Sequence, residues 1–131
     1  MSFNVLVVDD SATVRAIIVK TMRIANGNVS EIFEAGHGEE ALQVLQEKWV
    51  DLVLTDINMP VMIGVELIKH MQANDAMKGI PVVVVSTEGS STRMNELEAM
   101  GVRAYIRKPF TPEKMSEVVE QLLGAADERP S

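Results

Sequence analysis

Three carboxylates in this sequence follow apolar runs, in positions that could let them hold a cation together. Asp9 and Asp10 close the first such run, and Asp56 closes the third. Two like charges about 4 Å apart repel by about 4 kcal/mol at an effective dielectric near 20, so the adjacent pair needs a compensating charge. A divalent cation would supply it, and an oxygen-only site with positions open for water and phosphate suits Mg²⁺. The residue types therefore predict a magnesium site.

Two further reactive side chains also close apolar runs. Ser86 ends the fourth run and Lys108 the fifth. With the carboxylates they suit phosphoryl transfer, in which Asp56 is the nucleophile, Lys108 gives the phosphoryl group a second positive charge and Ser86 gives a hydrogen bond. Each residue alone also has a structural explanation. The aspartate pair could cap a helix, and Asp56 could lie in a turn. Ser86 could be a buried hydroxyl with a hydrogen-bond partner, and Lys108 a solvated surface charge. Their coincidence at four strand ends favours one shared site.

Five apolar runs separated by helical patterns predict the elements that position these residues. Three runs are continuous, as in strands covered on both faces of a parallel sheet, and two are weaker; they are 4–10, 50–56 and 80–87, then 29–35 and 103–109. A strand–helix unit repeated five times predicts an α/β fold with a doubly wound, five-stranded parallel sheet. In such sheets ligands bind beyond the carboxyl ends of the strands, where the reactive residues fall.

Apolar residues at helical spacing indicate which helix faces are buried. The faces comprise Val14, Ile17, Ile18 and Met22; Leu42, Leu45 and Trp49; Val65, Ile68 and Met71; and Met115, Val118, Val119, Leu122 and Leu123. A more polar fourth helix is expected around Leu97. Gly79 and Gly101 fall where helix C-caps are expected.

Composition limits the number of domains and excludes several classes of protein. The 131 residues fit one domain, which we expect to span 1–124, with a polar tail at 125–131. A net charge of −7 without a basic cluster argues against direct nucleic-acid binding. The absence of cysteine excludes disulfides and thiolate chemistry. With neither a signal-peptide pattern nor a membrane-spanning run, we expect a cytoplasmic protein without membrane insertion.

Four segments of the chain occur together in a known family: VLVVDDS, DLVLTDINMPVM followed by Gly64, PVVVVST and YIRKPF. On these segments the chain resembles a response-regulator receiver domain over essentially its full length, and it is similar to the single-domain chemotaxis response regulators. The resemblance implies a flavodoxin-like fold with strand order 2-1-3-4-5. It makes Asp56 the phosphoacceptor and, with Asp10, a direct Mg²⁺ ligand. Asp9 would act mainly through water, and the backbone carbonyl of Asn58 would complete the ligands.

The same resemblance implies a conformational switch. Ser86 takes the position of the switch hydroxyl, and Tyr105 takes that of the switch aromatic residue. The Lys108–Pro109 bond is cis in the family. Asn58 and Glu88 take the two positions that tune the lifetime of the phosphoryl group.

The implied function is a phosphorylation-activated signalling switch of a two-component system. A sensor histidine kinase would dock near the first helix and pass its phosphoryl group to Asp56. The output protein would bind a face formed by the fourth helix, the fifth strand and the fifth helix. Such a receiver catalyses its own phosphorylation and dephosphorylation, and we expect no enzyme activity beyond that.

Three alternatives stay open at this point. The chain could be a receiver domain excised from a longer regulator with a separate output domain. A flavin-binding electron carrier would need a Ser/Thr/Gly-rich phosphate loop after the first strand and more aromatic residues than the 4% present. An aspartate-nucleophile phosphatase would need a DxD pattern at the first strand and a cap insertion, and neither occurs.

The sequence departs from the receiver-domain pattern at Ile63, where the family usually has an aspartate that is not a metal ligand.

Overall fold

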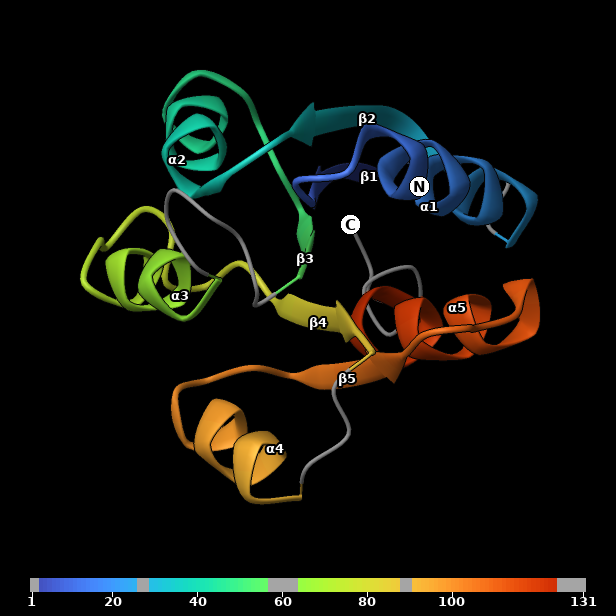
Figure 1. Ribbon diagram of the computed structural model, residues 1–131. Helices are drawn as coiled ribbons and strands as arrows, with labels where there is room; N and C mark the ends of the chain where they lie inside the picture. The colour runs from blue at the N-terminus through green and yellow to red at the C-terminus, as the bar shows by residue number, and fades with distance from the viewer. Residues whose placement is uncertain (1–2, 26–28, 57–63, 88–90, 125–131) are drawn as a thin grey trace.

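A computed structural model describes residues 3–25, 29–56, 64–87 and 91–124 (Figure 1). The strands are β1 (Phe3–Val8), β2 (Val29–Ala35), β3 (Leu52–Thr55), β4 (Val82–Ser86) and β5 (Ala104–Arg107). The helices are α1 (Ala12–Ala25), α2 (Gly38–Glu47), α3 (Gly64–Gln72), α4 (Ser91–Ala99) and α5 (Pro112–Val119), and α5 continues into a π-helical turn, Glu120–Gly124. The α/β repeat predicted from the sequence is confirmed. The tail at 125–131 lies outside the described residues.

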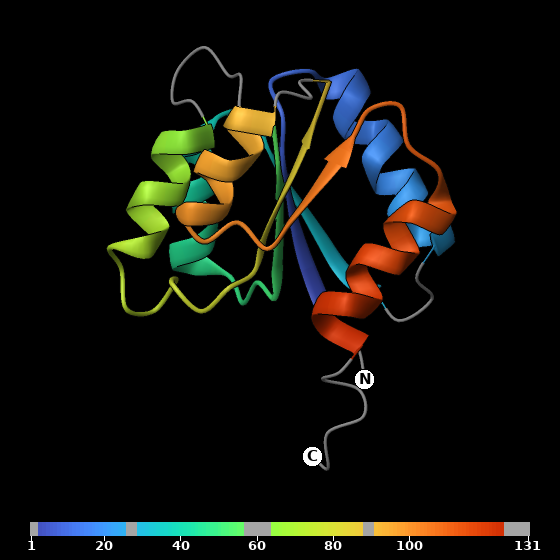
Figure 2. The same cartoon turned by 90° about the horizontal axis from the view of Figure 1, so that it is seen from below.

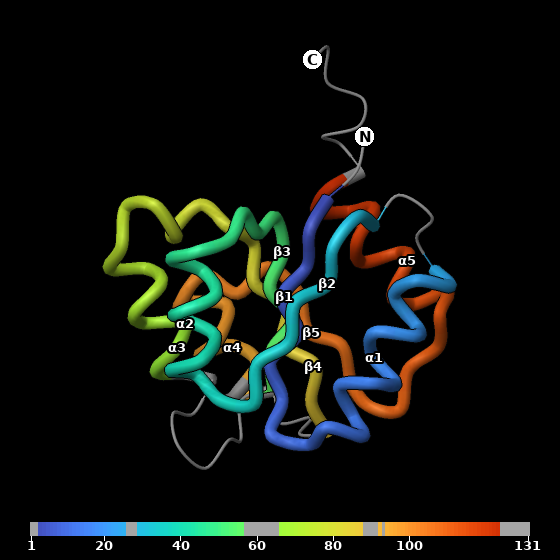
Figure 3. The backbone as a smooth tube through the Cα atoms, turned by 90° about the horizontal axis from the view of Figure 1, so that it is seen from above, coloured from blue at the N-terminus to red at the C-terminus, as the bar shows by residue number. Residues whose placement is uncertain are grey.

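The five strands form one parallel sheet in the order β2-β1-β3-β4-β5, which confirms the fold class and the strand order. Helices α1 and α5 cover one face of the sheet, and α2, α3 and α4 cover the other (Figures 2 and 3). Val5 and Val7 of β1 pack in the core beneath α1 and α5, whereas Leu6 and Val8 pack in the core on the opposite face. Both faces of the strand are buried, so its sequence is apolar throughout instead of alternating.

Parallel pairing brings the carboxyl ends of the strands to one edge of the sheet. Val8 at the end of β1 lies opposite Thr55 at the end of β3, and Ser86 at the end of β4 lies opposite Arg107 at the end of β5. The loops that follow these strands therefore meet at that edge, where the sequence had placed the reactive residues.

Two helical faces differ from the prediction. Ile17 was expected on the buried face of α1, but 55% of it is exposed, and Ile18 and Met22 make the contact with the core. Trp49 was expected to continue the buried face of α2, but α2 ends at Glu47 and the indole is 78% exposed.

One of the two predicted glycine caps is present. Gly101 has φ +101° and ends α4 in a Schellman motif, because its N–H donates to Glu98 O at 3.0 Å and that of Val102 donates to Leu97 O at 3.1 Å. Gly79 is not a cap, since α3 already ends at Gln72.

Within the described part of the chain, no helix combines the length and apolar character that crossing a bilayer requires.

Candidate functional site

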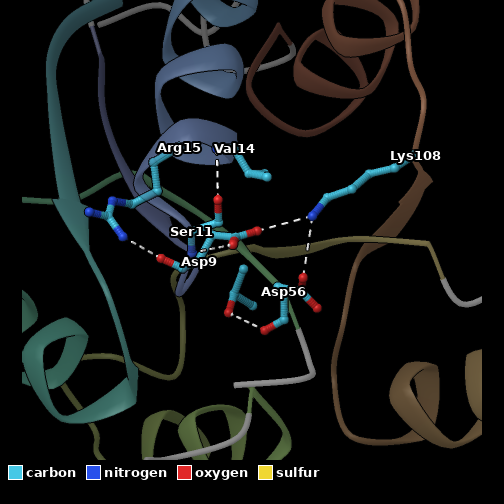
Figure 4. A network of polar contacts seen from close by, with 7 residues as sticks. Asp9, Ser11, Val14, Arg15, Asp56 and Lys108 are labelled. Carbon is cyan, nitrogen blue, oxygen red and sulfur yellow. Dashed lines mark hydrogen bonds and ion pairs between the residues drawn. The ribbon is translucent and has the colours of Figure 1, made fainter. Parts of the chain in front are cut away.

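Two aspartates and one lysine meet at the carboxyl edge of the sheet (Figure 4). The Nζ of Lys108 lies 3.0 Å from Oδ2 of Asp9 and 3.3 Å from Oδ2 of Asp56. Asp9 follows β1 and Asp56 follows its neighbour β3, whereas Lys108 follows the edge strand β5. The fold thus brings together three of the residues that the sequence assigned to one site.

The charges in this cluster depend on protein partners, because water reaches them poorly. The side chain of Asp9 is 3% exposed, that of Asp56 14% and that of Lys108 17%. Burial lowers the pKa of Lys108, but the hydrogen bonds and negative charges of Asp9 and Asp56 outweigh burial and raise it above 10.5. The lysine is therefore a cation at neutral pH, and the three groups together carry a formal charge of −1.

Backbone hydrogen bonds fix the points from which these side chains start. The N–H of Asp56 donates to Val8 O at 3.0 Å, and the N–H of Lys108 donates to Ser86 O at 2.9 Å. The Lys108–Pro109 peptide bond is cis, as the family resemblance implied. These bonds connect the end of β1 to that of β3 and the end of β4 to that of β5, next to the cluster.

Ser11, and not the aspartate pair, caps α1. Its Oγ accepts a hydrogen bond from the N–H of Val14 at 3.2 Å. The Oδ1 of Asp9 accepts the N–H of Ser11 at 2.9 Å, so each carboxylate oxygen of Asp9 has a donor. Helix capping is therefore not needed to explain Asp9, because its side chain faces Lys108.

Two carboxylates of the cluster, those of Asp9 and Asp56, could bind a cation, but no third carboxylate lies beside them in the described residues. The side chain of Asp10 is exposed, and among the described residues no three Asp, Glu or His side chains surround a position that could hold a metal ion. Asn58 lies outside the described residues. Asp9 and Asp56 nevertheless suit a hard cation, since their oxygens come from neighbouring strand ends and one ammonium leaves their charge incompletely balanced. The ligand set of Asp9, Asp10, Asp56 and Asn58 stays a prediction.

The residues assigned to the switch lie on the two strands nearest Lys108. Ser86, the last residue of β4, is 1% exposed, whereas the following Thr87 is exposed. Tyr105 in β5 is half-buried, lies opposite Val84 and lines a groove of about 550 Å³ between α4 and β5. Glu88 lies outside the described residues. Ser86 and Tyr105 thus occupy adjacent strands, and their assignment to a switch stays a prediction.

Arg15 belongs to the polar network around Asp9, although the sequence reasoning gave it no role. Its Nη1 donates to the backbone O of Asp9 at 2.5 Å, and its Nε donates to Oε1 of Glu34 at 3.1 Å. It lies close to the N-terminus of α1, where a positive charge opposes the helix dipole. That unfavourable placement is the one sequence signal that could have pointed to a specific contact.

Residues 5–120 match the family described as response regulator receiver domain. The chain belongs to this family. The receiver domain is 39% identical over 125 residues to chemotaxis protein CheY1 of Helicobacter pylori strain J99, a match covering 95% of this chain and 99% of that protein. It is 40% identical over 123 residues to the chemotaxis protein CheY homolog of Campylobacter jejuni, with 92% of each chain covered.

Solved structures support the same fold for the receiver domain. Chemotaxis protein CheY4 of Vibrio cholerae superposes with a TM-score of 0.84 at 32% identity, covering 94% of this chain and all of that one (100%). A putative response regulator from Chloroflexus aurantiacus superposes with a TM-score of 0.86 at 27% identity, covering 95% and 99%. Membership of this family is consistent with a phosphorylation-activated two-component switch, and receiver domains generally use Mg²⁺ at the phosphorylation site.

Proposed function

We propose that this receiver domain is the phosphorylation-activated switch of a two-component system and that Asp56 accepts the phosphoryl group from a histidine kinase. The main support is the position of Lys108, whose ammonium contacts Asp56 at the carboxyl edge of the sheet. The Asp56 side chain is 14% exposed, so it keeps a route to a donor outside the domain. Because the named relatives are chemotaxis proteins, we place the switch in chemotaxis signalling.

The chemistry assigned to Asp56 is nucleophilic. One carboxylate oxygen bonds to the phosphorus of a phosphohistidine while the P–N bond breaks, and the imidazole keeps that electron pair and takes up a proton. The ammonium of Lys108 stabilises the negative charge on the transferred phosphoryl oxygens and on the Asp56 carboxylate. The hydroxyl of Thr55 donates to the backbone O of Asp56 at 2.8 Å, which helps to hold the acceptor at the strand end.

Asp9, Asp10, Asp56 and the backbone carbonyl of Asn58 are the residues that would hold Mg²⁺. When bound, this ion supplies positive charge to the phosphoryl oxygens during transfer. Asp9 contributes a carboxylate that the Ser11 N–H and Lys108 already orient toward the acceptor.

Ser86 and Tyr105 would couple phosphorylation to an output surface. A phosphoryl group on Asp56 adds charge and acceptor oxygens that attract the Ser86 hydroxyl, and the space it leaves lets the half-buried Tyr105 turn inward. The groove between α4 and β5, whose apolar lining includes Met94, Leu97 and Val102, would change shape with Tyr105. An output protein binding the α4–β5–α5 face would thus distinguish the two states, provided that they differ by only a few kcal/mol.

The lifetime of the phosphoryl group is assigned to two positions, Asn58 and Glu88. Both assignments come from the family resemblance alone and are part of this proposal.

The proposal is tested by incubation with acetyl phosphate and Mg²⁺, followed by intact mass spectrometry and mapping of the modified residue. Wild-type protein should gain one phosphoryl group on Asp56, and Asp56→Asn should gain none. Asp75→Asn is the matched control, because the Asp75 side chain is 96% exposed and lies outside the cluster. Full labelling of Asp56→Asn, or no labelling of the wild-type protein, would contradict the assignment.

A further inference from the structure

We infer that Arg15 is a positioning residue of this site, which holds the backbone of Asp9 so that its carboxylate faces the acceptor and the cation. The inference rests on the proposed function, because it concerns the same site. In Figure 4 Arg15 approaches Asp9 from the side opposite to Lys108. Asp9 is therefore held at its main chain by one cation and at its side chain by another.

The guanidinium of Arg15 bridges two acceptors on different elements. Nη1 bonds to the main-chain oxygen of Asp9, which follows β1, while Nε bonds to the carboxylate of Glu34 in β2. The Arg15 side chain is 18% exposed, and that of Glu34 is 47% exposed. The buried end of the bridge is thus at Asp9, and the solvated end is at Glu34.

The carbonyl of Asp9 needs this donor because the residue lies beyond the paired strands. Asp9 is 2% exposed, and the last paired residue of β1 is Val8. A buried carbonyl left without a donor is destabilising, so the chain would relax by turning this peptide group toward water. Such a rotation would also reorient the Asp9 carboxylate, which is attached to the same residue.

A surface ion pair with Glu34 does not by itself account for Arg15. Exposed ion pairs of this kind contribute little to stability, and the positive charge lies at the unfavourable end of the helix dipole. The Asp9 contact gives the arginine a second and buried partner. Because a planar guanidinium can donate in two fixed directions at once and a lysine ammonium is a single point charge, lysine is a poor replacement.

Electrostatics and positioning predict effects of opposite sign on cation affinity. Removing a positive charge beside a Mg²⁺ site strengthens the attraction of the ion, so charge alone predicts tighter binding by Arg15→Ala. Loss of a group that orients a metal ligand through a hydrogen bond, without binding the metal itself, weakens metal binding by about 10–100-fold. We therefore expect Arg15→Ala to bind Mg²⁺ at least about tenfold more weakly than wild type.

The experiment compares wild type with Arg15→Ala, Arg15→Lys and the control Arg23→Ala. Arg23 is exposed in the last turn of the same helix, so its removal makes the same change in charge without touching Asp9. Mg²⁺ affinity is obtained from the rise of the melting temperature with ion concentration, with the metal-free melting temperature measured separately. The amide resonance of Ser11, whose N–H donates to the Asp9 carboxylate, reports the orientation of Asp9 in metal-free protein.

Weaker Mg²⁺ binding by both Arg15 variants, with a shifted Ser11 resonance and a wild-type result for Arg23→Ala, supports the inference. Unchanged or tighter binding by Arg15→Ala overturns it, as does a Ser11 resonance at the wild-type position in both Arg15 variants. If wild type itself does not bind Mg²⁺, the proposed metal site fails, and the Ser11 resonance still decides whether Arg15 orients Asp9. Should Arg15→Ala fail to fold, Arg15→Lys carries the comparison.

Discussion

Replacing Lys108 by methionine removes the positive charge shared by the two aspartates. The change breaks charge-assisted hydrogen bonds of 3.0 Å to Asp9 and 3.3 Å to Asp56 and leaves both carboxylates without their cation. Removing one partner of a buried ion pair costs about 3–5 kcal/mol. The second bond is long and both Lys108 and Asp56 retain some contact with water, so we expect a loss near the lower limit, about 3 kcal/mol.

The assay is thermal unfolding in chelator and then in Mg²⁺. For a chain of this length each kcal/mol shifts the melting temperature by roughly 3–5 °C, so Lys108→Met should melt about 10 °C below wild type without metal. Added Mg²⁺ should recover part of the difference, because in the proposed metal site the ion would bring positive charge to the same carboxylates. Lys78→Met is the control, since Lys78 forms an exposed pair with Asp75 and its removal should change stability by less than about 1 kcal/mol.

The pH dependence gives this prediction a second test. The pKa of Lys108 is higher in the folded protein than the usual 10.5, so the folded state holds the proton more tightly than the unfolded state does. The stability that Lys108 contributes is therefore complete below about pH 10.5 and is lost as pH rises through the folded-state pKa. The gap between wild type and Lys108→Met should be constant around neutral pH and close only in strong alkali. Equal melting temperatures in chelator at neutral pH would refute the reasoning.

Two further substitutions test contacts away from the cluster. Gly101→Ala should lose about 1–2 kcal/mol in urea unfolding, because φ is +101° and the new Cβ would lie 2.6 Å from Nε2 of Gln72; unchanged stability would contradict the cap geometry. Asp51→Ala should lose about 1–2 kcal/mol and alter Trp49 fluorescence, because its carboxylate accepts the Asn4 N–H at 2.8 Å and the indole N–H at 3.0 Å. Asp51→Asn, which keeps one carbonyl acceptor, is its control and should lose less.

The sheet and its reactive edge could be predicted because each strand carries its own signal. A strand buried on both faces must be apolar at every position, so β1, β3 and β4 are visible as continuous runs. The residue after each run must then lie at the carboxyl edge of a parallel sheet, which is why Asp9, Asp56 and Lys108 could be grouped before any contact was known.

The exposure of Ile17 and Trp49 could not be predicted, because it depends on which neighbours cover a helix. In α1, Ile18 packs in the core with residues of the sheet and of α5, whereas the neighbouring Ile17 is 55% exposed. At the end of α2 the chain leaves helical geometry at Lys48, whose φ is −124° and ψ 152°. The indole of Trp49 then bonds to Asp51 instead of packing.

The contacts that long polar side chains make could not be predicted from the sequence either. Arg15 bonds to a main-chain oxygen, which any residue type could supply. Its place near the N-terminus of a helix indicates a specific contact, but it does not identify Asp9 as the partner. Asp10 carries the same side chain as Asp9 but is exposed, because successive residues leaving a strand point in different directions. Adjacent identical residues therefore have different environments, which only the path of the backbone determines.

The compensation of the buried negative charge depends on the complete sheet. Asp9 and Asp56 lie at the ends of two strands that pair directly, so forming β1 and β3 already brings the like charges together. The cation that balances them follows β5, with β4 between β5 and β3 in the sheet, and lies 99 residues after Asp9 in the chain. A partly assembled sheet without β5 would thus hold the repelling pair without its lysine. Since the charges are balanced only when β5 is in place, Asp56 and the groove that β5 lines depend on the same strand, and a substitution at either should affect the other.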